Sequence, residues 1–558
     1  MELSYIDGLF LAKTRYGEWE AKNAGFLWDP KLKIWWTDDP EKAYVIRKAA
    51  EPAVQQQIIQ LCKDGHERDT STIRESQATD AEIAVPVPDG LNYLPYQRAG
   101  IAYALKRRAT LIGDEMGLGK TVQSIGVLNA SPKIENVLVI CPASLRLNWK
   151  RELETWMVHK KEIGIATSKK FPAEPVRIIN YDILHNHQYN LRRIPWDVMI
   201  VDECHYLKNP KARRTRHVLG HGKALSPILA QRRLFLTGTP ILNKPVELWP
   251  ILKSIDPMDW GSWKTFTKLF CGAYHDGYGW NVSGATNFDK LQYRLRSTCM
   301  IRRLKADVLT DLPTKRRQVI ELPANGSMKL VKREQAQLFE HQTKLERLRD
   351  VMAEAKAKGS DVQYKDAVKQ LKQATGVAFS EMSSVRKEIA VSKVGAVVEC
   401  ARQIVDAGNK VLLFAHHHEV IDALVKEFDP KEVVKLDGRD SMKERDASVR
   451  KFQETESVKV FVGGIRAAGV GLTLTASSHV IFAELDWVPG NMAQAEDRCH
   501  RIGQKNSVLI QHLVVEGSID AIMAKNLVRK QNMIEKALDK GIDKGIEKPE
   551  LNPEPLLF

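Results

Sequence analysis

Apolar and polar positions follow two different patterns along this chain. Residues 109–112 and 196–201 are short runs of aliphatic and β-branched side chains without alternating polar positions, as is typical of parallel strands buried on both faces. Residues 328–393 are instead rich in Lys, Glu, Gln and Ala. Their apolar positions keep helical spacing, at Leu338, Leu345, Leu348 and Met352. The patterns predict an α/β protein with a helical insertion near its middle.

The first 50 residues have a composition of their own. Four of the twelve tryptophans lie there: Trp19, Trp28, Trp35 and Trp36. The spacing predicts a helix over 19–23 and then a short hairpin with Asp29 and Pro30 in its turn. We interpret this part as a small α+β module whose aromatic residues mostly form its core. The alternative for one or two of them is an exposed position, stacked on unpaired bases.

A turn rich in glycine follows the first apolar run. Gly117 and Gly119 allow the backbone to close around phosphates, with N–H groups and the start of a helix near Lys120 facing the negative charge. Lys120 is placed to reach the terminal phosphates, and the Thr121 hydroxyl to bind magnesium. Asp114 stands where the usual pattern begins with glycine. The predicted nucleotide contacts in this turn are Asp114, Glu115, Met116, Gly117, Leu118, Gly119, Lys120 and Thr121.

Two acidic residues end the second apolar run, Asp202 and Glu203. The carboxyl ends of strands are where open α/β sheets place their ligand groups. Asp202 is suited to hold magnesium through water, and Glu203 to orient an attacking water. The alternative is an ordinary solvated acidic turn.

A third segment lies near the end of the chain. Arg498 and Arg501 are three residues apart, so on a helix they share a face and can converge on one phosphate. Surface arginines on an exposed helix are the alternative for this segment taken alone. With the two preceding segments, it describes an ATP site with a phosphate loop on one lobe and arginine fingers on another.

These motifs, in this order, resemble the Swi/Snf-type ATPases of helicase superfamily 2, over roughly residues 91–540. The resemblance implies an α/β fold of two RecA-like lobes, each a parallel sheet flanked by helices, and an ATP-driven motor on double-stranded DNA. Segments 494–504 and 414–417 look most similar to the annealing-helicase (HepA-related) branch. The N-terminal residues Ala21, Gly25, Lys33 and Trp35 resemble a small module of phage and bacterial DNA-processing proteins.

The resemblance also implies roles for individual residues. Gln97 is expected to contact the adenine, Gly469 to contact the nucleotide, and Gln494 to belong to the catalytic set with Lys120 and the arginines. The implied DNA contacts are Ser144, Asn148, Trp149, Tyr181, Thr239, Arg466 and Trp487. The implied cofactors are ATP and Mg²⁺, with Thr121 and Asp202 as the metal ligands.

These features divide the chain into six parts. We expect a tryptophan-rich module (1–50), a linker (51–90), a first lobe with a helical protrusion (91–305), a linker with a helical insertion (306–394), a second lobe (395–540) and a tail (541–558).

Charge and cysteine content agree with this interpretation. The chain has 84 Lys and Arg against 69 Asp and Glu, a net charge of +15, which favours a polyanionic partner. We expect duplex DNA, bound mainly through backbone phosphates. The seven scattered cysteines form no C-x-x-C pair, so we expect no structural zinc and a reducing compartment. No apolar run is long enough to span a bilayer. The expected location is the cytoplasm or nucleoid of a bacterium, or a phage-infected host.

Two rival functions use the same motifs. A strand-separating DNA or RNA helicase shares the ATP chemistry, but the block around Leu312 and Pro313 and the helical insertion favour a duplex translocase. A scaffold that binds ATP without hydrolysis would lack the acidic pair or the arginines, and this chain has both.

Overall fold

The computed structural model describes residues 1–14, 18–222, 224–238, 240–241, 244–275, 280–309, 311–324, 326–357, 361–468 and 472–524. The chain separates into two compact units. The smaller contains residues 1–77 and 294–298, and the larger contains the rest. None of the described helices combines the length and apolar character needed to cross a membrane.

The smaller unit is built on an antiparallel sheet in the order β1-β2-β4-β3. Helix α1 (Glu18–Asn23) precedes the hairpin of β3 (Leu27–Asp29) and β4 (Ile34–Thr37), as predicted. Asp29 Oδ1 accepts hydrogen bonds from the backbone N–H groups of Lys31 and Leu32, at 2.8 and 3.1 Å, which fixes the turn. The remaining elements are β1 (Glu2–Ile6), β2 (Leu9–Lys13), α2 (Pro40–Val45) and α3 (Pro52–Gln77).

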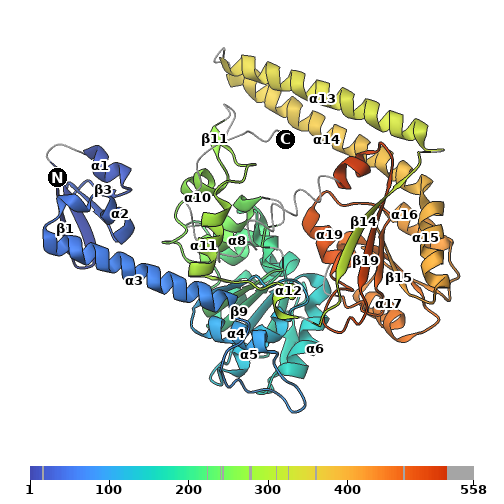
Figure 1. Cartoon of the computed structure of the whole chain (residues 1–558), viewed down its shortest axis with the longest axis horizontal. Helices are drawn as coiled ribbons and strands as arrows, with labels where there is room; N and C mark the ends of the chain where they lie inside the picture. The colour runs from blue at the N-terminus through green and yellow to red at the C-terminus, as the bar shows by residue number, and fades with distance from the viewer. Residues whose placement is uncertain are drawn as a thin grey trace. The chain divides into compact units, whose positions relative to one another are not determined.

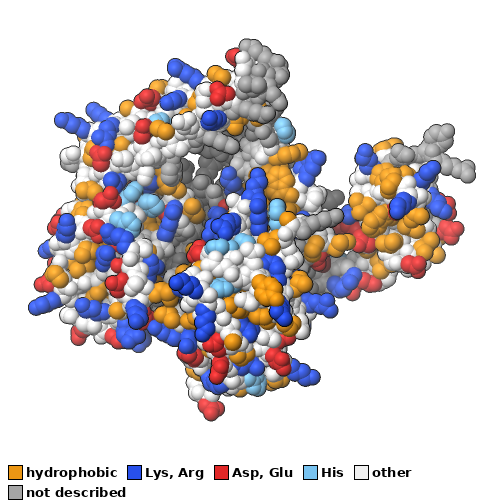
Figure 2. Space-filling model, turned by 180° about the vertical axis from the view of Figure 1, so that it is seen from behind, with side chains coloured by type: hydrophobic (Ala, Val, Ile, Leu, Met, Phe, Trp, Pro, Cys, Tyr) orange, Lys and Arg blue, Asp and Glu red, His pale blue; other side chains and the backbone are white. Residues whose placement is uncertain are grey.

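The predicted linker 51–90 is wrong over most of its length, because α3 is a helix of 26 residues. Its polar composition belongs to the solvated side of the helix. Ile58, Leu61 and Cys62 occupy the other side and pack on the core of the small module. Several large apolar side chains of the module remain exposed, and apolar surface is prominent on it in Figure 2. They are Ile6, Trp19, Leu27, Trp28, Leu32, Tyr44 and Val45.

The first lobe of the larger unit is a seven-stranded sheet in the order β13-β5-β10-β9-β6-β8-β7, and every neighbouring pair is parallel. Its strands are β5 (Ala109–Ile112), β6 (Val137–Cys141), β7 (Ile163–Ile165), β8 (Val176–Asn180), β9 (Trp196–Asp202), β10 (Ala230–Leu236) and β13 (Met300–Ile301). The longer helices around it are α4 (Pro95–Leu105), α5 (Lys120–Asn129), α6 (Arg146–Trp156), α8 (Arg213–Leu219), α9 (Trp249–Ile255), α10 (Trp263–Phe270) and α11 (Phe288–Thr298).

The second lobe is a six-stranded parallel sheet in the order β14-β19-β18-β15-β17-β16. Its strands are β14 (Lys315–Leu322), β15 (Val411–Ala415), β16 (Val433–Leu436), β17 (Val460–Gly464), β18 (His479–Phe482) and β19 (Val508–Val515). The helices are α15 (Val394–Asp406), α16 (His418–Lys426), α17 (Met442–Glu454), α18 (Ile465–Ala468) and α19 (Pro489–Glu496). Five successive residues of β15 are fully buried, the pattern expected of a strand covered on both faces.

The predicted insertion consists of two long helices, α13 (Met328–Ala357) and α14 (Asp361–Ser392), which lie side by side (Figure 1). The segment before them is not wholly a linker, because β14 is the edge strand of the second sheet. The second lobe therefore begins at Lys315, earlier than the predicted boundary at 395.

Candidate active site

The register of the first sheet brings the predicted site segments to one edge. Ile112 is level with Leu236 and Ile301, and Leu236 is level with Asp202. All four strands are parallel, so the segments that follow them leave the sheet at the same edge. The phosphate loop, Glu203, and the segments beginning at Thr237 and Arg302 therefore meet there.

The phosphate loop requires both of its glycines. Gly117 and Gly119 have φ values of 87° and 72°, in the left-handed region that favours glycine. A Cβ at Gly119 would lie 2.5 Å from Gln97 Nε2, so the Gln97 amide is directly beside the loop. Helix α5 begins immediately after Gly119, which places the helix N-terminus where the sequence predicted an anion site.

The ammonium group of Lys120 lies inside the loop. Its Nζ donates hydrogen bonds to the carbonyl oxygens of Asp114 and Glu115, at 2.9 and 3.3 Å. Burial lowers the pKa of Lys120, and the carboxylates of Glu203, Asp114 and Asp202 act in the opposite direction. Lys120 is thus a cation held in a site rich in carbonyl and carboxylate oxygens, ready to exchange these partners for phosphate oxygens.

The structure corrects the predicted role of Asp114. Its carboxylate is fully buried and pairs with Arg303, whose Nε lies 3.0 Å from Oδ1, while Gln123 Nε2 donates to Oδ2 at 2.8 Å. Burial alone would raise the pKa of Asp114, but Arg303 outweighs it and keeps the pKa low. An occupied, buried carboxylate is unavailable to a nucleotide. Asp114 instead anchors the loop to the segment after the last strand, which explains a non-glycine residue at this place.

Other loop side chains are also engaged within the protein. The side chains of Met116 and Leu118 are buried, and Glu115 Oε2 accepts a hydrogen bond from the backbone N–H of Lys305 at 2.7 Å. These three residues can therefore meet a phosphate through their backbone N–H groups only.

The acidic pair is held by aromatic residues behind it. Trp149 Nε1 donates to Asp202 Oδ2 at 2.8 Å, and the Tyr181 hydroxyl donates to the carbonyl oxygen of Asp202 at 2.6 Å. Burial, together with the neighbouring Glu203, raises the pKa of Asp202 to about 7. Glu203 has φ 48° and lies 3.3 Å from His205 Nδ1. The two carboxylates have different neighbours, Trp149 for Asp202 and His205 for Glu203, so they can have different tasks.

The arginine segment of the second lobe reaches the same place. A Cβ at Gly117 would lie 2.8 Å from Arg501 Cβ, so the segment lies directly against the phosphate loop. Arg501 NH1 donates to the carbonyl oxygen of Leu472 at 2.8 Å. Burial and the neighbouring Arg501 lower the pKa of Arg498 to about 10, while Glu203 counteracts this. Gln494 and Glu203 line one pocket of 200 Å³.

Sequence reasoning missed the residue that connects these parts. Lys305 Nζ lies 2.9 Å from Asp497 Oδ1 and 3.8 Å from Glu115 Oε1. Asp497 also receives Lys315 Nζ at 3.0 Å. The lysine after the first sheet thus bridges the phosphate loop and the arginine segment. The sequence offered only the place of Lys305 shortly before Leu312 and Pro313, and that place indicates no contact partner.

The predicted DNA contacts divide into two groups. Trp149 is only 1% exposed and Tyr181 is also buried, so the prediction that they touch DNA is wrong, because both support Asp202. Ser144 and Asn148 are partly exposed, and the side chain of Arg466 is 66% exposed. The guanidinium of Arg386 lies 4.6 Å from the ring centre of Trp487. Thr239 and Gly469 lie outside the described residues.

The donor set fits a nucleotide with magnesium. Gly117 and Gly119 are in the left-handed region, and a Cβ at either would collide with Arg501 or Gln97, while Lys120 Nζ lies on a carbonyl oxygen of the same loop. The Thr121 hydroxyl and the Asp202 carboxylate are hard oxygen ligands of the kind Mg²⁺ takes, with the remaining positions left to phosphate and water. Within the part of the chain that the structure describes, three or more His, Cys, Asp or Glu side chains do not group as a metal site.

Comparisons with known proteins agree with this geometry. Residues 96–376 match the family described as SNF2-related domain, and residues 393–503 match the helicase conserved C-terminal domain. The chain is 34% identical over 476 residues to the DNA annealing helicase and endonuclease ZRANB3 of Homo sapiens, a stretch that covers 81% of this chain and 41% of that protein.

Two further likenesses were found. The SWI/SNF-related matrix-associated actin-dependent regulator of chromatin subfamily A-like protein 1 of Xenopus laevis is 31% identical over 553 residues, covering 96% of this chain and 53% of the relative. A solved Sulfolobus solfataricus SWI2/SNF2 ATPase core in complex with dsDNA is 23% identical, with a TM-score of 0.38, and covers 83% of this chain and all of that one. The chain spans about half of these curated relatives or less.

Proposed function

Because the chain belongs to the SNF2-related family, we propose that it is a motor that hydrolyses ATP to move along or remodel DNA. The observation that carries the proposal is the contact between Gly117 of the first lobe and Arg501 of the second. It joins a phosphate loop to a pair of arginines, and phosphoryl transfer needs both parts in one place.

Each residue then has a distinct task. The loop N–H groups and Lys120 bind the phosphates, and Gln97 lies beside the loop where it can contact the base. Glu203 orients the attacking water, with His205 fixing its carboxylate. Thr121 and Asp202 hold Mg²⁺, which on binding neutralises part of the phosphate charge. Arg498 and Arg501 stabilise the charge that develops on the transferred group, and Gln494 lines the adjoining pocket.

The proposed partner is double-stranded DNA. One relative is named a DNA annealing helicase, and the net charge of +15 favours a polyanion. We assign backbone phosphate contacts to Ser144, Asn148 and Arg466, the predicted residues that are accessible in the described structure. Alternating closure and opening of the lobes around ATP would shift these contacts along the duplex.

The proposed setting is the reducing interior of a bacterial or phage-infected cell. Its support is the N-terminal module's likeness to phage and bacterial proteins and seven cysteines that carry free thiols in the structure.

The test is ATPase activity with and without nucleic acid. Lys120→Ala and Glu203→Gln should abolish hydrolysis, and Glu203→Gln should still bind ATP because its phosphate contacts remain. Lys150→Ala serves as the control, because among the described residues Lys150 forms only a surface pair with Glu154. Full hydrolysis by Glu203→Gln would remove Glu203 from the mechanism. Stronger stimulation by RNA than by duplex DNA would favour an RNA helicase, and unwinding of a blocked duplex would favour a strand-separating one.

A further inference from the structure

A second large pocket lies in the first lobe, away from the nucleotide site. Its volume is 1350 Å³, and it is lined where β5, β9 and β10 begin, by Arg108, Asp197 and Gln231 among others. The phosphate loop and Glu203 follow the other ends of these parallel strands. Neither the proposed ATP chemistry nor the predicted DNA contacts use this pocket.

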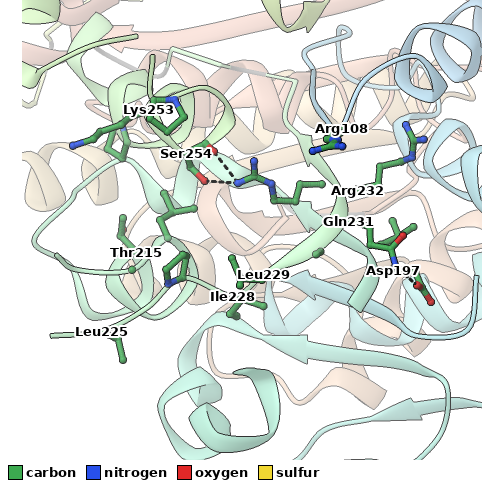
Figure 3. A pocket seen from close by; sticks show the side chains of 18 of the residues that line it. Arg108, Asp197, Thr215, Leu225, Ile228, Leu229, Gln231, Arg232, Lys253 and Ser254 are labelled. Atoms are coloured by element: carbon green, nitrogen blue, oxygen red, sulfur yellow. Dashed lines mark hydrogen bonds between the residues drawn. The ribbon is translucent and has the colours of Figure 1, made fainter. Parts of the chain in front are cut away.

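The charge of the pocket is positive. Figure 3 shows Lys253 and Arg108 on opposite sides of it. The acidic Asp197 accepts hydrogen bonds from Gln231 Nε2 at 3.0 Å and from the backbone N–H groups of Glu135 and Asn136. Its negative charge is therefore satisfied within the protein, and an incoming ligand meets the cations.

The two central arginines are already engaged. Arg232 donates to the carbonyl oxygen of Leu105 at 3.1 Å, and Arg233 to that of Ser254 at 2.7 Å. They close the C-terminal ends of α4 and α9, where free carbonyls need donors. The exposed cations left for a ligand include Arg108 and Lys253.

Two buried donors in the lining have no hydrogen-bond partner among the described residues. The side chain of Thr215 is 3% exposed, and its hydroxyl is unpaired. The indole N–H of Trp249 is likewise buried and unpaired. Leaving such a group unpaired costs about 1–3 kcal/mol. Both atoms are shielded from solvent, so the contacts open to a ligand are the exposed cations and apolar side chains of the lining.

The floor of the pocket is apolar. Leu225, Ile228 and Leu229 lie below the cations in Figure 3, and Leu229 is 73% exposed. A volume above the roughly 300–1,000 Å³ of small-molecule sites can accept several side chains. The lining thus fits a peptide that carries both acidic and bulky apolar residues.

The sequence contains a segment of this kind. We infer that the pocket binds residues 547–558 of this chain. Glu547, Glu550 and Glu554 outnumber the single Lys548 there, and the bulky apolar residues are Leu551, Leu556, Leu557 and Phe558. Its carboxylates complement the exposed Lys253 and Arg108, and its apolar side chains can cover Leu229.

The chain is long enough for this contact. The segment lies beyond the described residues, whose last member is Ala524. The intervening residues 525–546 can extend up to roughly 75 Å, more than the roughly 60 Å diameter of a compact unit of this size.

Cross-linking within the whole chain tests the inference. Leu229→p-benzoylphenylalanine places a photoreactive group at the pocket, and the cross-linked peptide is identified by mass spectrometry. Residues 547–558 should be recovered. Tyr189→p-benzoylphenylalanine is the matched control, because Tyr189 is similarly exposed in the first lobe but does not line the pocket. Equal recovery from both positions would overturn the inference, as would cross-links from Leu229 only to DNA, another protein or another part of the chain.

Substitutions then test the chemistry. Arg108→Glu should lower the cross-linking yield from Leu229 about threefold, because Arg108 is an exposed cation of the lining. Lys253→Glu should lower it about threefold, the size expected for an exposed ion pair. Glu550→Lys with Glu554→Lys should restore the yield in the Lys253→Glu chain. Cross-linking that none of these changes alters would contradict the inference. The readout does not require ATP hydrolysis, so it is independent of the proposed function.

Discussion

Asp114 and Arg303 form a buried ion pair that fixes the phosphate loop to the chain after β13. Both side chains are essentially inaccessible to solvent, and Gln123 donates to the same carboxylate. Removing one partner of a buried pair leaves the other charge without compensation. The pair therefore acts on stability first and on catalysis through loop position.

We expect Asp114→Ala to lower the free energy of unfolding by about 3–5 kcal/mol. Denaturant unfolding, followed by a probe of the first lobe, measures this. Asp80→Ala is the control, because the Asp80–Arg98 pair is exposed, and it should cost less than about 1 kcal/mol. Equal losses in the two variants would show that Arg303 does not depend on Asp114.

Arg498 and Arg501 should affect turnover far more than nucleotide affinity. Replacing either with Ala removes charge stabilisation in the transition state, an effect on the order of 10³-fold or more in related phosphoryl transfers. Steady-state ATPase rates and nucleotide-binding titrations separate the two quantities. Arg450→Ala is the matched control, because Arg450 is exposed and pairs only with Asp446 among the described residues. Normal ATPase rates in both variants would show that Arg498 and Arg501 are ordinary structural arginines.

Helix α13 rests on the second lobe through a carboxyl group with an unusual environment. Glu334 is 1% exposed, and its Oε2 accepts from the backbone N–H of Ile519 at 2.7 Å, while Oε1 has no hydrogen-bond partner among the described residues. Burial raises the pKa of Glu334 to about 7, and the nearby Asp520 adds to this. The folded state therefore favours the protonated form.

This gives a pH dependence with a definite sign. Because the folded pKa is raised, the folded chain binds more protons than the unfolded chain between pH 4.5 and about 7, so stability falls as the pH rises through that window. Glu334→Gln should remove a pH-dependent loss of about 3 kcal/mol in the free energy of unfolding. The variant should therefore be more stable than the parent at pH 8. Unfolding at pH 6 and pH 8 measures it. The exposed Glu340 on the same helix supplies the control Glu340→Gln, and a parent-like pH profile for Glu334→Gln would contradict the assignment.

The elements that could be predicted from the sequence were those whose residue pattern has a single physical explanation. The continuous apolar run at 196–201 predicted a buried strand, and Asp29-Pro30 predicted the turn between β3 and β4. Helix α3 was missed because its apolar side is narrow, with Ile58 and Ile73 its only buried apolar residues. Strand β14 was missed because exposed and partly exposed residues fill it.

The same distinction applies to the site, where local motifs could be predicted but the contact partners of their side chains could not. Local spacing predicted the glycines, Lys120 and the acidic pair. It could not predict that Trp149 and Tyr181 turn inward to Asp202, or that Arg303 takes Asp114, because these contacts join segments far apart in the chain. The same holds for Lys315 and Arg317, which bind Asp497 and Glu496 within the second lobe.

The motor as a whole should respond to duplex DNA in a salt-dependent manner. Contacts to backbone phosphates release counterions, so a protein that neutralises about six phosphates loses roughly 10³-fold in affinity between 50 and 200 mM salt. DNA titrations monitored by ATPase rate measure the slope. Arg466→Ala should make it shallower by about one, whereas Arg450→Ala should change it less. A salt-independent affinity would exclude binding through phosphates.

The bridge made by Lys305 restricts how the two lobes can come apart. Its backbone N–H is bound to Glu115 and its ammonium group to Asp497, so one side of the bridge must release before the site can open. If Asp497 releases, Lys305 travels with the first lobe and the chain bends after it, before Lys315. If Glu115 releases, Lys305 stays with the second lobe and the bend falls between Arg303, which Asp114 holds, and Lys305. The relative strength with which Glu115 and Asp497 bind Lys305 therefore decides where the chain pivots.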